Sequence, residues 1–72
     1  MKKVVLTYPE SFNDLEEESS AISTRGLFVH PSFSERKLTV STLFNDGKLE
    51  KIFTKDAIAA YEKSGIGVEI VK

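Results

Sequence analysis

The stretch LTVSTLFNDGKLEKIFTKDAIAAYEKSGIGVEI, residues 38–70, decides the fold because each of its segments carries its own boundary signal. Large apolar or β-branched side chains recur at alternate positions in residues 36–44, and Leu49 and Phe53 can meet them from residues 49–53, which predicts two strands. Between them, Asn45-Asp46-Gly47 is typical of a type I′ hairpin turn, because Asp-Gly accepts the positive φ angles of that turn. The centre of the chain is therefore predicted to be a β-hairpin.

The two-residue turn also sets which residues of this hairpin face each other. It pairs Phe44 with Leu49, Thr42 with Lys51, and Val40 with Phe53. A three-residue loop would pair Phe44 with Lys48 and scatter the apolar side chains, so we prefer the first register. In that register Leu43 and Ile52 lie side by side on the opposite face of the hairpin.

A helix is predicted over residues 55–64, immediately after the hairpin. Thr54 is a suitable N-cap, and Phe53 and Ile58 have the spacing of a hydrophobic staple. Gly65 can adopt the left-handed conformation that commonly closes a helix. The alternation of apolar residues in 66–70 then predicts a final strand.

The first half of the chain adds two strands and one helix to the prediction. Residues 3–8 form an apolar, β-branched run that ends at Pro9, and residues 27–30 form a shorter one that ends at Pro31. Between them, residues 11–22 have a helical apolar spacing, with Ser11 as the expected N-cap. The predicted element order is therefore β-α-β-β-β-α-β.

These elements predict a small α+β domain in a single unit, residues 1–72. We expect two layers, with a mixed or antiparallel sheet and both helices packed on one of its faces. A chain of 72 residues buries only about 60% of its unfolded surface, so its margin of stability is small. The sequence contains no Cys, which excludes disulfides and suits a cytoplasmic location.

The composition offers little for catalysis, metal binding or cofactor binding. His30 is the single histidine, and no thiolate or second ligand accompanies it at a recognisable spacing. No nucleophile motif of the Gly-x-Ser-x-Gly type is present either. We therefore expect neither an enzyme nor a cofactor, and no apolar run reaches the roughly 20 residues that span a membrane.

The leading interpretation is a non-enzymatic protein-binding module: an adaptor, inhibitor or regulatory partner of a larger protein. This description suits small phage or accessory bacterial proteins, by analogy alone. The expected contact residues are Leu43, Ile52 and the nearby Lys51, because an apolar patch on an uncovered sheet face often marks a partner contact. Self-association into a homodimer is a further expectation.

The alternative is a nucleic-acid or nucleotide-binding domain that uses the basic side chains around the hairpin. The residues concerned are Arg36, Lys37, Lys48 and Lys51, with Phe33 as an aromatic on which a base stacks. Glu35 and Glu50 dilute this basic region, and the net charge of the whole chain is −1. The overall charge therefore differs from the strongly basic character of most nucleic-acid binders, and protein binding is preferred.

Overall fold

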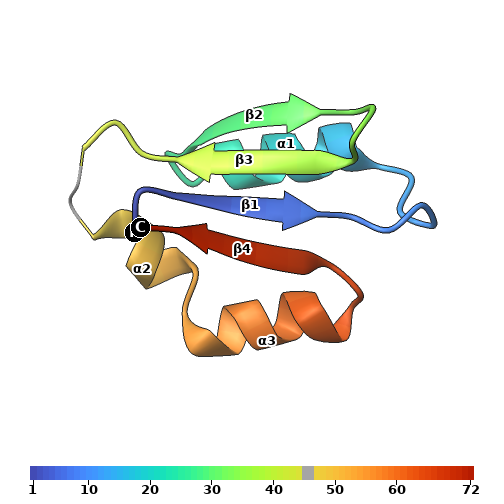
Figure 1. The fold of residues 1–72 in the computed structure, drawn as a ribbon. Helices are drawn as coiled ribbons and strands as arrows, with labels where there is room; N and C mark the ends of the chain where they lie inside the picture. Colours follow the sequence, from blue (N-terminus) through green and yellow to red (C-terminus); the bar gives the residue numbers. More distant parts are fainter. Residues whose placement is uncertain (45–46) are drawn as a thin grey trace.

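The structure, a computed structural model, describes residues 1–44 and 47–72 and consists of one four-stranded sheet with helices on one side of it (Figure 1). Its elements follow each other as β1 (Lys3–Thr7), α1 (Leu15–Ser23), β2 (Phe28–Ser32), β3 (Lys37–Ser41), α2 (Lys48–Ile52), α3 (Lys55–Lys63) and β4 (Gly67–Val71). The α+β class expected from the sequence is confirmed.

The strands lie in the order β2-β3-β1-β4, and every neighbouring pair is antiparallel. Since β1 and β2 are both antiparallel to β3, they run in the same direction with β3 between them. By the same argument, β3 and β4 run in the same direction with β1 between them. The chain thus forms two interleaved split β-α-β units.

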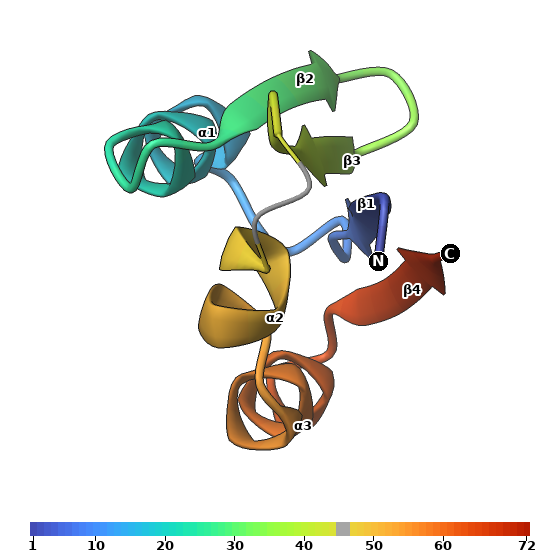
Figure 2. The ribbon, with the colours of Figure 1, turned by 90° about the vertical axis from the view of Figure 1, so that its left-hand side faces the viewer.

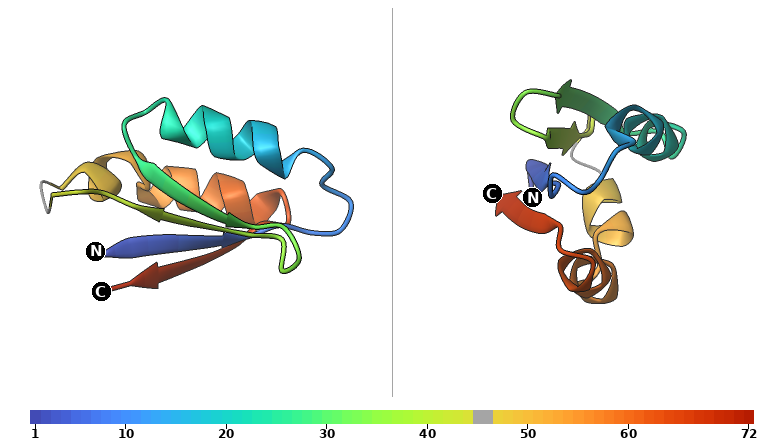
Figure 3. Two further views of the ribbon diagram at one scale, coloured as in Figure 1. Left: turned by 90° about the horizontal axis from the view of Figure 1, so that it is seen from above. Right: turned by 90° about the vertical axis from the view of Figure 1, so that its right-hand side faces the viewer.

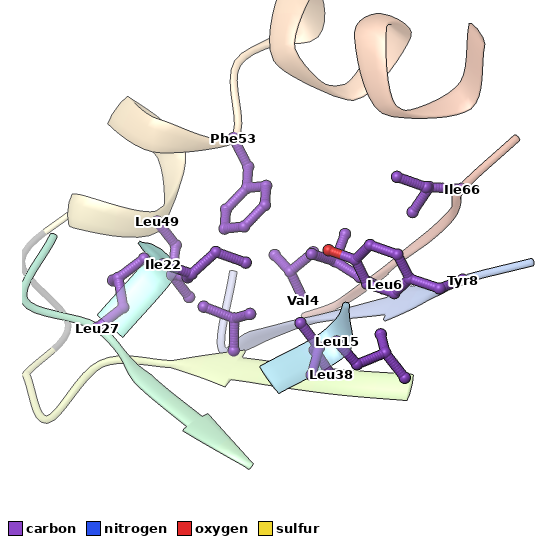
Figure 4. Packing of buried hydrophobic residues seen from close by; sticks show 11 residues of the cluster. Val4, Leu6, Tyr8, Leu15, Ile22, Leu27, Leu38, Leu49, Phe53 and Ile66 are labelled. Atoms are coloured by element: carbon purple, nitrogen blue, oxygen red, sulfur yellow. The ribbon is translucent and has the colours of Figure 1, made fainter. Parts of the chain in front are cut away.

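All three helices lie on the same side of the sheet in Figures 2 and 3. The face that they cover carries Val4 and Leu6 of β1, which stand opposite Val40 and Leu38 of β3. These four side chains are fully buried. They form the floor of an apolar core that the helices close from above, and Figure 4 shows how the helix residues reach into it.

The predicted central hairpin is wrong, because residues 48–52 form helix α2 and not a strand. Leu49 and Phe53 are both buried, as expected, but their spacing of four residues fits one face of a helix as well as one face of a strand. Lys51 distinguishes a helix from a strand here, since a strand would place the Lys51 charge on the same face as the buried Leu49 and Phe53. The hairpin of the structure is β2–β3, and Asn45 and Asp46 of the predicted turn lie outside the described residues.

The boundaries of the two longer helices follow their capping residues. The prediction for α3 is confirmed: the Thr54 hydroxyl accepts a hydrogen bond from the backbone N–H of Ala57 at 3.2 Å, and Gly65 has φ = +84°. Helix α1 starts later than predicted, because Asp14 and not Ser11 is its N-cap. The Asp14 carboxylate accepts from the N–H of Glu17 at 3.3 Å.

The second face of the sheet carries mainly polar side chains. The register places eight polar residues on it, Lys3, Thr7, His30, Ser32, Lys37, Thr39, Ser41 and Glu69, together with the apolar Val5, Phe28 and Val71. A polar face of this kind is typical of an antiparallel sheet that is solvated on one side. The expected apolar docking face is therefore not found here, because Leu43 and Ile52 lie outside the sheet.

Candidate functional site

The basic residues proposed as nucleic-acid contacts are divided between two ends of the molecule. Phe33 and Arg36 lie in the turn between β2 and β3, whereas Lys48 and Lys51 belong to α2. Figure 1 shows this turn and α2 at opposite ends of the sheet. The structure therefore does not bring these side chains together into one basic surface.

Arg36 is held in place by contacts within the chain. Its Nε and Nη2 atoms donate to the backbone oxygen of Pro9 at 3.1 and 3.0 Å, and Nη2 also donates to the oxygen of Phe12. Its own carbonyl accepts from the N–H of Tyr8 at 2.8 Å. The guanidinium fastens the segment before α1 to the β2–β3 turn, which is a structural role.

Two of the remaining lysines also have contacts within the chain. The Nζ atom of Lys48 donates to the backbone oxygen of Gly26 at 3.3 Å. The Nζ atom of Lys37 lies 3.9 Å from a carboxylate oxygen of Glu35 in a solvent-exposed pair. The charge arrangement thus gives the nucleic-acid alternative no additional support.

The three expected protein contacts are not adjacent either. Leu43 lies in the loop after β3, and Ile52 is the last residue of α2, where it is half-buried. Lys51 is exposed on α2. Their predicted proximity depended on the hairpin register, which the formation of α2 removes.

Leu43 nevertheless belongs to the most exposed apolar group of the described chain. The Leu43 side chain is 71% exposed and the Phe44 side chain is 70% exposed. Two surface hollows that share Met1 and Lys2 lie against this loop and against Ile70 of β4, which is 37% exposed. We refer to Met1, Leu43, Phe44 and Ile70 as the end cluster.

The end cluster lies where β1 begins and where β3 and β4 end, close to both ends of the chain (Figure 1). The loop that carries it is fixed locally, since the Thr42 hydroxyl donates to the backbone oxygen of Phe44 at 2.6 Å. Charged residues border it: Lys2, Lys72 and Glu50 line the hollow beside Ile70. An apolar centre with a charged border is the usual composition of a protein contact surface.

Phe44 is the member of this cluster that sequence reasoning misplaced. The hairpin register put it in the core opposite Leu49, whereas the structure leaves it in solvent. Leu43 and Phe44 are adjacent, and a strand turns adjacent side chains to opposite faces. In the hairpin register this alternation was already satisfied by Leu43 on the uncovered face, so it did not indicate that Phe44 is exposed.

His30 and the acidic side chains are the residues to examine for a metal site. His30 is exposed on the polar face of the sheet, opposite Thr39 of β3. No group of three or more His, Cys, Asp or Glu side chains in residues 1–44 and 47–72 is placed to hold a metal ion. Burial, with the nearby Glu18 carboxylate, raises the pKa of Tyr8, whose hydroxyl donates to Glu18 at 3.3 Å.

None of the helices in the described ranges has the length and apolar character that a membrane crossing requires. Comparison with protein-family models, with curated proteins and with solved structures finds no match to this chain. The end cluster is therefore the feature from which a function is inferred.

Proposed function

We propose that this chain is a protein-binding module and that the end cluster is its contact surface. The observation that carries the proposal is the exposure of Leu43 and Phe44, two neighbouring large apolar side chains that are 71% and 70% exposed. A contiguous exposed apolar patch is uncommon on a monomeric protein and often marks an interaction site.

The geometry also indicates what kind of partner fits. Side chains that are exposed to this extent project from the surface, so the partner must supply an apolar pocket that receives them. Moving a Leu or Phe side chain from water into such a pocket is worth about 1.5–3 kcal/mol each. Two adjacent anchors with a charged border can therefore supply much of the energy of a moderately tight contact.

The proposed role is that of an adaptor, inhibitor or regulatory partner without catalysis of its own, located in the cytoplasm. The partner is either a different protein or a second copy of this chain, and the test below distinguishes the two. Lys51 and Ile52 stay predicted contacts, but they lie on α2 and not within the end cluster.

The experiment uses a double variant with a matched control. Leu43→Ser/Phe44→Ser removes both anchors, while Phe33→Ser removes a comparably exposed aromatic, 56% exposed, in the β2–β3 turn at the opposite end of the molecule. Each immobilised protein captures partners from an extract of the source cell, and quantitative mass spectrometry compares them. Circular dichroism confirms that both variants keep the wild-type fold.

We expect a protein that the wild type and Phe33→Ser retain equally and that the double variant loses by about tenfold or more. Light scattering after size exclusion shows whether this protein is a second copy. Equal capture by all three proteins would refute the end cluster as the contact surface. Binding of single-stranded DNA or RNA that weakens steeply with rising salt would instead support the nucleic-acid alternative.

A further inference from the structure

Another hollow, separate from the two at the end cluster, lies on the helix side of the sheet beside α3. Its volume is about 340 Å³. Helix α3 contributes Ala57, Ala60 and Tyr61, and Ile52 at the end of α2 and Ile66 before β4 complete the apolar lining. Arg25, which follows α1, and Ser64, which follows α3, also line it. We refer to these seven residues as the α3 hollow.

Helical spacing explains why one face of α3 lines this hollow. Ala57, Ala60 and Tyr61 are three and four residues apart, so they share one face of the helix. Because the Ala side chains are small, they leave room for the hollow, and the Tyr61 ring forms part of its wall. This ring is positioned by Phe53, with a distance of 6.1 Å between the two ring centroids and an angle of 29° between their planes.

Two polar groups at this hollow have unused hydrogen-bonding capacity. Within residues 1–44 and 47–72, neither the Arg25 guanidinium nor the Tyr61 hydroxyl forms a hydrogen bond or a salt bridge with another side chain. Burial and the nearby Glu18 carboxylate raise the pKa of Tyr61, so its hydroxyl keeps its proton and can donate. The hollow therefore presents a cation and a neutral donor beside an apolar wall.

The charges around the hollow favour an anion at its Arg25 end. The guanidinium of Arg25 is the cationic group that lines this end of the hollow. The Glu18 carboxylate is the opposing charge near Tyr61. Its oxygen accepts the hydrogen bond from Tyr8, so an incoming anion is expected beside Arg25 and away from Glu18.

We propose that the α3 hollow binds a small organic anion that carries one carboxylate on an apolar body. The guanidinium of Arg25 binds the carboxylate in the two-pronged geometry that this pair favours. The apolar body lies against Ile52, Ala57, Ala60 and Ile66. The volume lies within the roughly 300–1,000 Å³ that small-molecule sites usually have.

The test compares three probes of equal chain length: octanoate, octylammonium and octanol. NMR titration of the intact protein follows the methyl groups of Ala57, Ala60 and Ile66. Arg25→Gln removes the cation, and Lys63→Gln on α3 removes one positive charge outside the hollow as a matched control. Both side chains are exposed, so both variants are expected to fold.

We expect octanoate to shift these methyl signals and to bind at least about tenfold more tightly than octylammonium or octanol. Arg25→Gln should weaken octanoate binding by about the same factor, while Lys63→Gln leaves it within about twofold. Equal binding of the three probes, no octanoate binding at all, or an unchanged affinity in Arg25→Gln would each overturn the proposal. None of these results depends on the end cluster.

Discussion

The Arg36 side chain joins two backbone carbonyls that lie 27 and 24 residues before it in the sequence, those of Pro9 and Phe12. Its backbone has φ = +57°, an uncommon conformation for a residue with a side chain. The residue thus combines a backbone penalty with a favourable set of charge-assisted hydrogen bonds. Its net effect on stability depends on both terms.

Two substitutions separate these terms. Arg36→Ala keeps the backbone penalty and loses the guanidinium, so it should lower the free energy of unfolding by about 2 kcal/mol. Arg36→Gly also loses the guanidinium but relieves the positive φ, and it should be about 1 kcal/mol more stable than Arg36→Ala. Urea denaturation followed by circular dichroism measures both. An Arg36→Ala protein as stable as the wild type would show that the guanidinium contributes nothing.

The caps of α3 were predictable because they depend on near neighbours, although the same reasoning chose Ser11 in place of Asp14 for α1, and roles that depend on distant residues were not predictable. Thr54 and Gly65 act within one helical turn of their own position, and both behave as the sequence indicated. The acceptors of Arg36 become neighbours only after the sheet has formed. Arg36 was interpreted as a nucleic-acid contact because its bonds to the carbonyls of Pro9 and Phe12 could not be foreseen from the sequence.

At the scale of single elements, α2 shows where a pattern of alternating residues is ambiguous. A segment of five residues with apolar side chains four apart is compatible with a strand or with a helix turn. The strands β3 and β4 carry a clear alternation, β1 is a continuous apolar run, and α3 has strong capping signals, so the sequence located all four. Helix α2 was missed because the Asn-Asp-Gly turn signal before it favoured a hairpin.

The helical form of residues 48–52 predicts unequal effects for two phenylalanines. The hairpin would bury both Phe44 and Phe53, whereas the structure buries only Phe53. Phe53→Ala should therefore destabilise the protein by about 3–5 kcal/mol, and Phe44→Ala should change its stability by less than about 0.5 kcal/mol. The measurement is the free energy of unfolding in urea.

Because a loss of this size can unfold a small domain, Phe53→Leu serves as a second variant with an expected cost of up to about 1.5 kcal/mol. Phe44→Leu is its matched control and should leave the stability unchanged. Comparable losses at the two positions would contradict the burial that the structure gives to this part of the chain.

The whole molecule is closed by pairing its first strand with its last. β1 pairs with β4 from Lys3 opposite Val71 to Thr7 opposite Gly67, and it pairs with β3 on its other side. The end cluster is a consequence of this closure, since it unites Met1, Leu43, Phe44 and Ile70 from three distant parts of the chain. No local pattern could have predicted that assembly; only Leu43 was singled out from the sequence.

The position of β1 inside the sheet predicts how the protein unfolds. The buried residues form one apolar cluster that includes strands and all three helices or their adjoining residues, so unfolding should be one cooperative transition. Backbone amides of β1 and β3 should exchange with solvent most slowly, at the rate of global unfolding, because each of these two strands has a strand on each side.

Amides in the outer strands β2 and β4 should exchange faster than those of β1, through local separation from the sheet edge. Hydrogen exchange followed by NMR at increasing urea concentrations tests this order. If the amides of β2 and β3 stay protected while those of β1 and β4 exchange together, the two halves open separately. The apolar core would then not hold the sheet as one unit.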